Sequence, residues 1–447
     1  MNEMIEVTVE DLSHQGEGIA KVNGYPLFIP GALPGDQLQI SITQLKKNFG
    51  LGRIIRILKA SADRVDPLCD KFGQCGGCQT MGLSYDAQLR FKEKRVRDSL
   101  LRIGHIKTLV LPVLGMQDPW YYRNKTQLPI GWHHGSLSIG FYQQASHQIV
   151  DTNRCYIQHP VMDAVRQIVR DYLNEYQVPI YDEKSGKGLV RHLVVKTGFA
   201  SKQVMVIVVI NGMKLPQQDM LISRLSKEIP GLVSVVLNHN KQKTNVIMGR
   251  ENTVIFGDAY LTDQLHHLTF RISPHAFFQV NPEQTEVLYS KVIECADLTG
   301  IETVLDLYCG IGTISLLLAQ KAGKVIGIET VEAAVKDARA NAELNGIFNV
   351  SFMAGMVENV MPQLAEPDQK PDVIVADPPR KGCDESVLRA MIKMNPIQIV
   401  YVSCNPATLA RDLRILEDGG YRTKEVQPVD MFPHSAHVET VVLLVKE

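Results

Sequence analysis

The stretch that decides the fold is TVLDLYCGIG, at residues 303–312. Its apolar first half predicts a buried strand over 303–308, and its two glycines allow a sharp turn into a helix over 313–322. Strand and helix then alternate toward the C-terminus. Further strands are expected at 324–329, 350–353, 372–376, 397–403 and 438–445, with a helix at 331–345. This alternation predicts a doubly wound parallel sheet, a Rossmann-like α/β domain over residues 266–447.

Acidic residues stand where two of the predicted strands end. Glu329 ends the second strand, and Asp377 follows the fourth in the sequence Asp-Pro-Pro-Arg. A carboxylate after the second strand can accept both hydroxyls of a ribose, while the loop after the first strand lacks the G-x-G-x-x-G pattern that cradles a pyrophosphate. The combination indicates a methyltransferase that uses S-adenosylmethionine. The alternative is that both acids only cap helices.

A cysteine and a glutamate are candidates for catalysis. Cys404 follows the fifth predicted strand, and Glu439 opens the last one. A thiolate that adds to C6 of uracil makes C5 nucleophilic enough to accept a methyl group, and a base must then remove the C5 proton. The alternative for Cys404 is a small buried apolar residue. His434 and His437 lack further ligands at metal spacing, so a structural or substrate-orienting role is expected for them.

The first 60 residues predict a small barrel. Short strands are expected at 5–9, 18–22, 25–29, 37–45 and 52–58, and Asn23-Gly24 is a strong hairpin signal. The second half of this region lacks acids and is basic. This face could be a solvated strand surface or could bind phosphates through Lys46, Lys47, Arg53, Arg56 and Lys59.

Residues 61–265 predict a mixed α+β domain that begins with a cysteine-rich loop. Cys69, Cys75 and Cys78 have the spacing C-x5-C-x2-C, and Cys155 is the best candidate for a fourth ligand. Four thiolates suit zinc and an iron–sulfur cluster equally well, and a chance grouping is the third alternative. A basic helix is expected at 84–101, with further helices near 160–176 and 217–228.

Composition limits the remaining possibilities. The chain has 447 residues, enough for about three domains. Its 47 Lys and Arg against 48 Asp and Glu exclude a globally basic binder, so any RNA-binding surface is a local patch. No apolar run approaches the ~20 residues that span a membrane, and the N-terminus does not look like a signal peptide. We therefore expect a cytoplasmic protein without membrane contact, in which cysteines serve as ligands or nucleophiles rather than in disulfides.

Taken together, the motifs resemble those of the RNA uracil-C5 methyltransferases, in the branch that modifies 23S ribosomal RNA. The resemblance covers essentially the whole chain. It is carried by HAFFQVN (275–281), DLYCG (306–310), DPPR (377–380), SCNP (403–406) and HVET (437–440).

The resemblance implies roles for individual residues. Cys404 would be the nucleophile and Glu439 the base. S-adenosylmethionine would be bound by Gln279, Tyr308, Glu329 and Asp377. Arg123, Asn124 and Lys125 match a stretch near the RNA site of the family. Two positions depart from some relatives, which have Asn where this chain has Thr313 and, approximately, Met356, so those cofactor contacts are not carried over.

The resemblance also implies the architecture and the second cofactor. Residues 1–60 would be a TRAM module, an OB-like RNA-binding barrel, and 61–265 a central RNA-binding domain. Cys69, Cys75, Cys78 and Cys155 would hold a [4Fe-4S] cluster with a structural and not a redox role. The basic helix is expected to pack on the catalytic domain despite its early position.

The expected substrate is 23S ribosomal RNA, and the expected state is a monomer. The main alternative is a transfer-RNA uracil-C5 methyltransferase. The barrel and the cysteine cluster argue against it. A non-catalytic RNA-binding protein is disfavoured by the intact Cys404 and Glu439. A DNA cytosine methyltransferase would have Pro-Cys after the fourth strand, where this chain has Asp-Pro-Pro.

Overall fold

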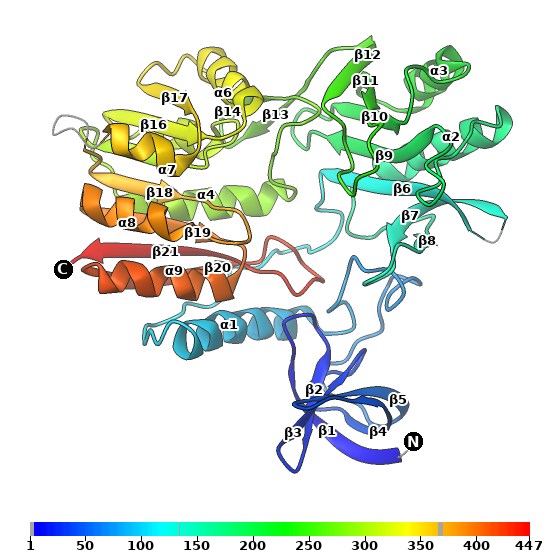
Figure 1. The fold of residues 1–447 in the computed structure, drawn as a ribbon, viewed down its shortest axis with the longest axis horizontal. Coiled ribbons are helices and arrows are strands. Elements are labelled where there is room, and N and C mark those ends of the chain that lie inside the picture. The colour runs from blue at the N-terminus through cyan, green and yellow to red at the C-terminus, as the bar shows by residue number, and fades with distance from the viewer. Residues whose placement is uncertain (1–3, 134, 365–369) are drawn as a thin grey trace.

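The computed structural model describes residues 4–133, 135–364 and 370–447. Its N-terminal part is a closed barrel with strand order β1-β2-β3-β5-β4, drawn in blue in Figure 1. The turn between β2 and β3 has positive φ at Asn23 and Gly24, as the hairpin signal predicted. The five expected strands are confirmed, with the bounds Met4–Leu12, Gly18–Val22, Tyr25–Ile29, Gln37–Leu45 and Gly50–Lys59.

The central part is a seven-stranded mixed sheet with the order β12-β11-β10-β9-β6-β7-β8. Helices α2 (Val161–Glu175) and α3 (Gln218–Glu228) pack on it and share its apolar core. The strands are β6 (Lys125–His133), β7 (Ser136–Tyr142), β8 (Ile149–Asp151), β9 (Val190–Thr197), β10 (Val204–Ile210), β11 (Leu232–His239) and β12 (Glu251–Gly257). The hairpin of β13 (Leu261–Leu265) and β14 (Leu268–Ile272) connects this part to the C-terminal domain.

The C-terminal sheet has the order β17-β16-β15-β18-β19-β21-β20. Its strands are β15 (Thr303–Leu307), β16 (Lys324–Glu329), β17 (Val350–Ala354), β18 (Val373–Ala376), β19 (Gln398–Ser403), β20 (Tyr421–Val429) and β21 (Glu439–Lys446). The expectation of a wholly parallel sheet was wrong at one edge. β21 runs antiparallel to both β19 and β20, because the chain returns from β20 through a short loop that needs no crossover helix. The strand order reverses between β15 and β18, which is where such sheets bind ligands.

Helices cover both faces of this sheet (Figure 1). One face packs against α4 (Pro282–Ala296), α5 (Thr313–Ala319) and α6 (Glu332–Leu344). The other packs against α7 (Val357–Val360), α8 (Glu385–Met394) and α9 (Pro406–Asp418), with the short helix η1 (Met361–Leu364) following α7. Successive residues of the strands alternate between the two cores, as in Val304 and Leu305.

The basic helix α1 (Tyr85–Arg102) lies beside α9 in Figure 1. Its Val96 and Leu100 are fully buried in the same core as Leu409 and Leu413 of α9. The expectation that it packs on the catalytic part is therefore confirmed. Across the described residues, no helix is both long enough and apolar enough to cross a membrane.

Candidate active site

One cavity of about 670 Å³ lies at the carboxyl ends of the parallel strands, within the usual size range of a small-molecule site. β15, β16, β18 and β19 all end at its wall, and β21 begins there. The cavity brings together the six residues that the sequence assigned to the cofactor and to catalysis: Gln279, Tyr308, Glu329, Asp377, Cys404 and Glu439. These residues come from a span of more than 150 positions, so the fold and not the chain order makes them neighbours.

The glycine loop after β15 is braced by Glu329. Gly310 and Gly312 have φ values of 56° and 84°, in the left-handed region where glycine carries no steric cost. The Glu329 carboxylate accepts hydrogen bonds from the backbone N–H of Gly310, at 3.1 Å, and of Val331, at 2.8 Å. Each carboxylate oxygen has a second lone pair. Glu329 can therefore shape the loop and still accept hydroxyl groups from a ligand in the cavity.

The loop that carries Gln279 is held by Asn124. The Asn124 side chain donates to the carbonyl of Gln279 at 2.9 Å, and its backbone N–H donates to Val280, also at 2.9 Å. Its neighbour Arg123 lines the cavity. The Arg-Asn-Lys stretch thus reaches the site from the central part of the chain, with Asn124 acting as a support.

The ligand-free site disfavours the charged forms of both Cys404 and Glu439. Burial raises the pKa of the Cys404 thiol to about 12, and the acidic groups of Glu439 and Asp377 push it the same way. Burial, followed by the proximity of Asp377, raises the pKa of Glu439 to about 8. Arg380 opposes both shifts. A cation placed among these groups would favour the thiolate and the carboxylate, since opposite charge stabilises the ionised form.

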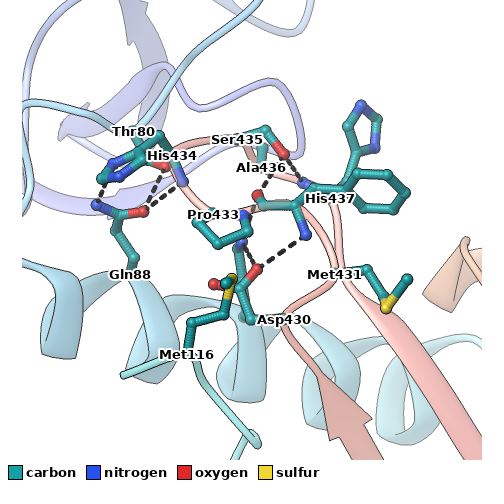
Figure 2. A network of polar contacts seen from close by, with 12 residues as sticks. Thr80, Gln88, Met116, Asp430, Met431, Pro433, His434, Ser435, Ala436 and His437 are labelled. Atoms are coloured by element: carbon teal, nitrogen blue, oxygen red, sulfur yellow. Dashed lines mark hydrogen bonds and ion pairs between the residues drawn. The ribbon is translucent and has the colours of Figure 1, made fainter. Parts of the chain in front are cut away.

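Two histidines of the loop between β20 and β21 point to opposite sides of it (Figure 2). The ring of His437 lines the cavity, and burial, with Arg380 and Arg95 nearby, lowers its pKa to about 4. The ring of His434 instead stacks on Trp120, with 3.9 Å between ring centroids. The neutral His437 is thus available to a substrate, and His434 serves the packing of the loop.

Several lining residues were not assigned from the sequence. Thr313 and Met356, where the family pattern fails, both line the cavity, as do Phe277, Tyr289 and Arg380. Met356 follows β17, so its place at a strand's carboxyl end was the signal that could have identified it. Phe277 is 63% exposed, an unusual state for a phenylalanine, and its ring is free to stack on a base.

The four cysteines of the predicted cluster line a second cavity, of about 380 Å³. Burial raises the pKa of Cys78, and the other three thiols raise it further in the order Cys155, Cys75, Cys69. In the described part of the chain, however, no three His, Cys, Asp or Glu side chains lie close enough together to hold a metal ion. This cavity shares lining residues with the first, namely Arg123, Val280, Arg380, Phe432 and His437.

A groove leads from the barrel to Cys404. His14 and Gln15 of the barrel, Arg95 of α1 and Cys404 line one and the same depression. The barrel's basic residues are exposed on β5 and on the turn that precedes it: Lys46, Lys47, Arg53, Arg56 and Lys59. The depression therefore connects the β1–β2 turn of the barrel with Cys404.

Comparison with known proteins agrees with this geometry. The pattern of the family described as "tRNA (Uracil-5-)-methyltransferase" matches residues 225–447, and that of the TRAM domain matches residues 2–55. An uncharacterized RNA methyltransferase of Halalkalibacterium halodurans is 51% identical, over 99% of this chain and 97% of its own length. Another, from Clostridium tetani, is 47% identical over 99% and 96%.

A solved structure is similar over the whole length. The tRNA (uracil-54, C5)-methyltransferase of Pyrococcus abyssi, in complex with S-adenosyl-L-homocysteine, is 26% identical. The match has a TM-score of 0.79 and covers 99% of this chain and all of that one. The chain belongs to the RNA (uracil-5-)-methyltransferase family, and it is an S-adenosylmethionine-dependent RNA methyltransferase with an N-terminal TRAM domain.

Proposed function

We propose that this enzyme methylates C5 of uridine in 23S ribosomal RNA. The observation that carries the proposal is the single cavity that joins Cys404 and Glu439 to the residues suited to S-adenosylmethionine, at the end of a groove from the barrel. The target uridine has to leave its stack to reach Cys404, which favours an RNA loop with unpaired bases.

The proposed mechanism has three steps. The thiolate of Cys404 bonds to C6 of the uracil, and C5 gains the electron pair. C5 takes the methyl group that S-adenosylmethionine supplies when bound. Glu439, as carboxylate, then removes the C5 proton, the double bond re-forms, and the thiolate leaves C6. Gln279, Tyr308, Glu329 and Asp377 would orient the cofactor so that its methyl group faces C5.

The choice between ribosomal and transfer RNA needs an experiment. The match to the transfer-RNA enzyme covers 99% of this chain and therefore includes the barrel, so the barrel does not separate the two substrate classes. Labelled S-adenosylmethionine should be incubated with bulk RNA from cells that lack the enzyme, and 23S and transfer RNA separated afterwards. We expect 5-methyluridine in 23S RNA. Label in transfer RNA alone would show that transfer RNA, not 23S RNA, is the substrate, and no label in either would mean that the enzyme methylates a different RNA.

We further propose that Cys69, Cys75, Cys78 and Cys155 hold a [4Fe-4S] cluster. The donor set supports the proposal by its chemistry, since four thiols line that cavity and thiolates are the ligands of such clusters. Binding would have to draw the four side chains closer together than they lie in the described structure. The cluster would fix the loop of residues 69–78 on the central sheet. Protein purified without oxygen is expected to contain iron and acid-labile sulfide, and Cys78→Ser is expected to lose most of both, whereas Cys295→Ser, at a buried cysteine elsewhere, keeps them. Zinc in place of iron would contradict the proposal.

A further inference from the structure

The loop between β20 and β21, residues 430–438, forms part of the boundary between the two cavities. Phe432 and His437 line both of them, and Glu439 follows the loop directly. The other groups of the active site have different supports. Tyr308 follows β15, Glu329 ends β16, Asp377 follows β18 and Cys404 follows β19. The position of this loop therefore affects His437 and Glu439 before it affects the nucleophile or the cofactor.

One end of the loop is fixed by an ion pair with α1. Lys92 Nζ lies 2.5 Å from Asp430 Oδ1, and both side chains are completely buried. Lys92 also donates to the carbonyl of Phe432 at 3.0 Å, and the Tyr85 hydroxyl donates to Asp430 at 3.0 Å. A buried pair of this kind is satisfied only in one geometry, so it fixes the start of the loop relative to α1.

The middle of the loop is fixed by Gln88, one turn earlier on α1 (Figure 2). The backbone N–H of His434 donates to Gln88 Oε1 at 2.9 Å, and the Gln88 amide nitrogen lies 3.3 Å from His434 Nδ1. His434 has a φ of 66°, a conformation that costs energy in a residue with a side chain. Such a conformation persists only where its surroundings hold it, and Gln88 is completely buried at that point.

The 430–438 loop is also held by Gln79 and Thr80, which follow the cysteine loop of residues 69–78. The backbone N–H groups of Gln79 and Thr80 both donate to the carbonyl of His434 at 3.0 Å. The Gln79 side chain accepts from the N–H of Ala436 at 3.3 Å and donates to the carbonyl of Gly76 at 2.8 Å. Gln79 thus ties the loop between Cys75 and Cys78 to the loop that precedes Glu439.

We propose that Gln88, assisted by Gln79, is a positioning residue for the proton-removal step. It holds the 430–438 loop so that Glu439 faces the C5 proton of a methylated uracil bound to Cys404. This inference rests on the proposed roles of Cys404 and Glu439. The nucleophile and the residues proposed to bind the cofactor follow strands other than β21. Loss of the Gln88 hydrogen bonds to the loop should therefore impair elimination and spare addition and methyl transfer.

The test variant is Gln88→Met, which keeps the side-chain volume and removes its hydrogen bonds to His434. We expect turnover to fall about 100-fold, the effect of a small misplacement of a catalytic group. The KM for S-adenosylmethionine should stay within about twofold of the wild-type value, since the cofactor residues are untouched. A covalent adduct between protein and methylated RNA should accumulate, visible as a band of raised mass in a denaturing gel. Gln88→Glu, which returns an acceptor to the N–H of His434, should recover part of the turnover.

The control is Gln167→Met, the same substitution at an exposed glutamine of α2, which should behave as wild type. The inference fails if Gln88→Met turns over normally, or if it loses adduct formation and turnover together. Should Gln88→Met not fold, Gln79→Met, at a half-buried position, is judged by the same criteria. Glu439→Gln, run beside them, separates the two hypotheses. If it forms no methylated adduct, the proposed base is wrong. If Glu439→Gln forms the methylated adduct and Gln88→Met does not, the positioning role is wrong.

Discussion

Replacing Cys404 with alanine is expected to abolish both methyl transfer to RNA and covalent capture of the RNA. Without a thiolate at C6, C5 of uracil is not nucleophilic enough to accept a methyl group. Removal of a nucleophile in other enzymes lowers kcat by about 10⁴- to 10⁶-fold, and we expect a loss of that size. Cofactor binding should persist, because Glu329 and Asp377 lie on other strands.

The measurement uses RNA that contains 5-fluorouridine. Fluorine cannot leave C5 as a proton does, so the wild-type enzyme should stop at the covalent adduct in the presence of S-adenosylmethionine. Cys404→Ala should give no adduct. Cys295→Ala is the matched control, since Cys295 is buried in α4 and does not line the cavity. An adduct formed by Cys404→Ala would show that another residue is the nucleophile.

Much of the active site could be predicted because its residues stand at the ends of local patterns. The carboxyl ends of parallel strands meet at one edge of a sheet, so Glu329, Asp377 and Cys404 could be brought together from strand boundaries alone. Asn23-Gly24 likewise predicted its turn from two residues. The role of each residue in the reaction remains a prediction that the variants above test.

The supports of the site could not be predicted, because they depend on contacts between distant parts of the chain. The sequence shows Lys92 only as one charge of a basic helix, whereas the structure buries its side chain completely against Asp430. β20 was missed, and with it the antiparallel return of β21. Both failures concern the same region, since the 430–438 loop joins β20 to β21. A pattern of charge or hydrophobicity within one segment carries no information about a partner more than 300 residues away.

Glu439→Gln is expected to let a single methyl transfer proceed and then to stall. Addition of the Cys404 thiolate and transfer of the methyl group need no base at C5, whereas release of the RNA does. A glutamine cannot take the C5 proton, so the methylated RNA should remain bonded to Cys404. Turnover is expected to fall by about 10²- to 10⁴-fold, the usual contribution of a general base. The measurement is a denaturing gel of enzyme with labelled S-adenosylmethionine and unmodified RNA, in which the label should move with the protein.

The pH dependence of turnover gives an independent check on the base. Because burial and Asp377 raise the pKa of Glu439 to about 8, the carboxylate is the minor form at neutral pH. Only the carboxylate can accept a proton, so the elimination rate should rise with pH by about tenfold per unit below pH 8 and level off above it. At pH 6 the covalent intermediate of the wild-type enzyme with ordinary RNA should accumulate, because little Glu439 is ionised. A rapid shift to alkaline pH should then speed RNA release, while the intermediate of Glu439→Gln should not respond. If the variant showed the same rise and plateau, the titrating group would be another residue, and Asp377, whose pKa burial raises to about 6, would be the next to test.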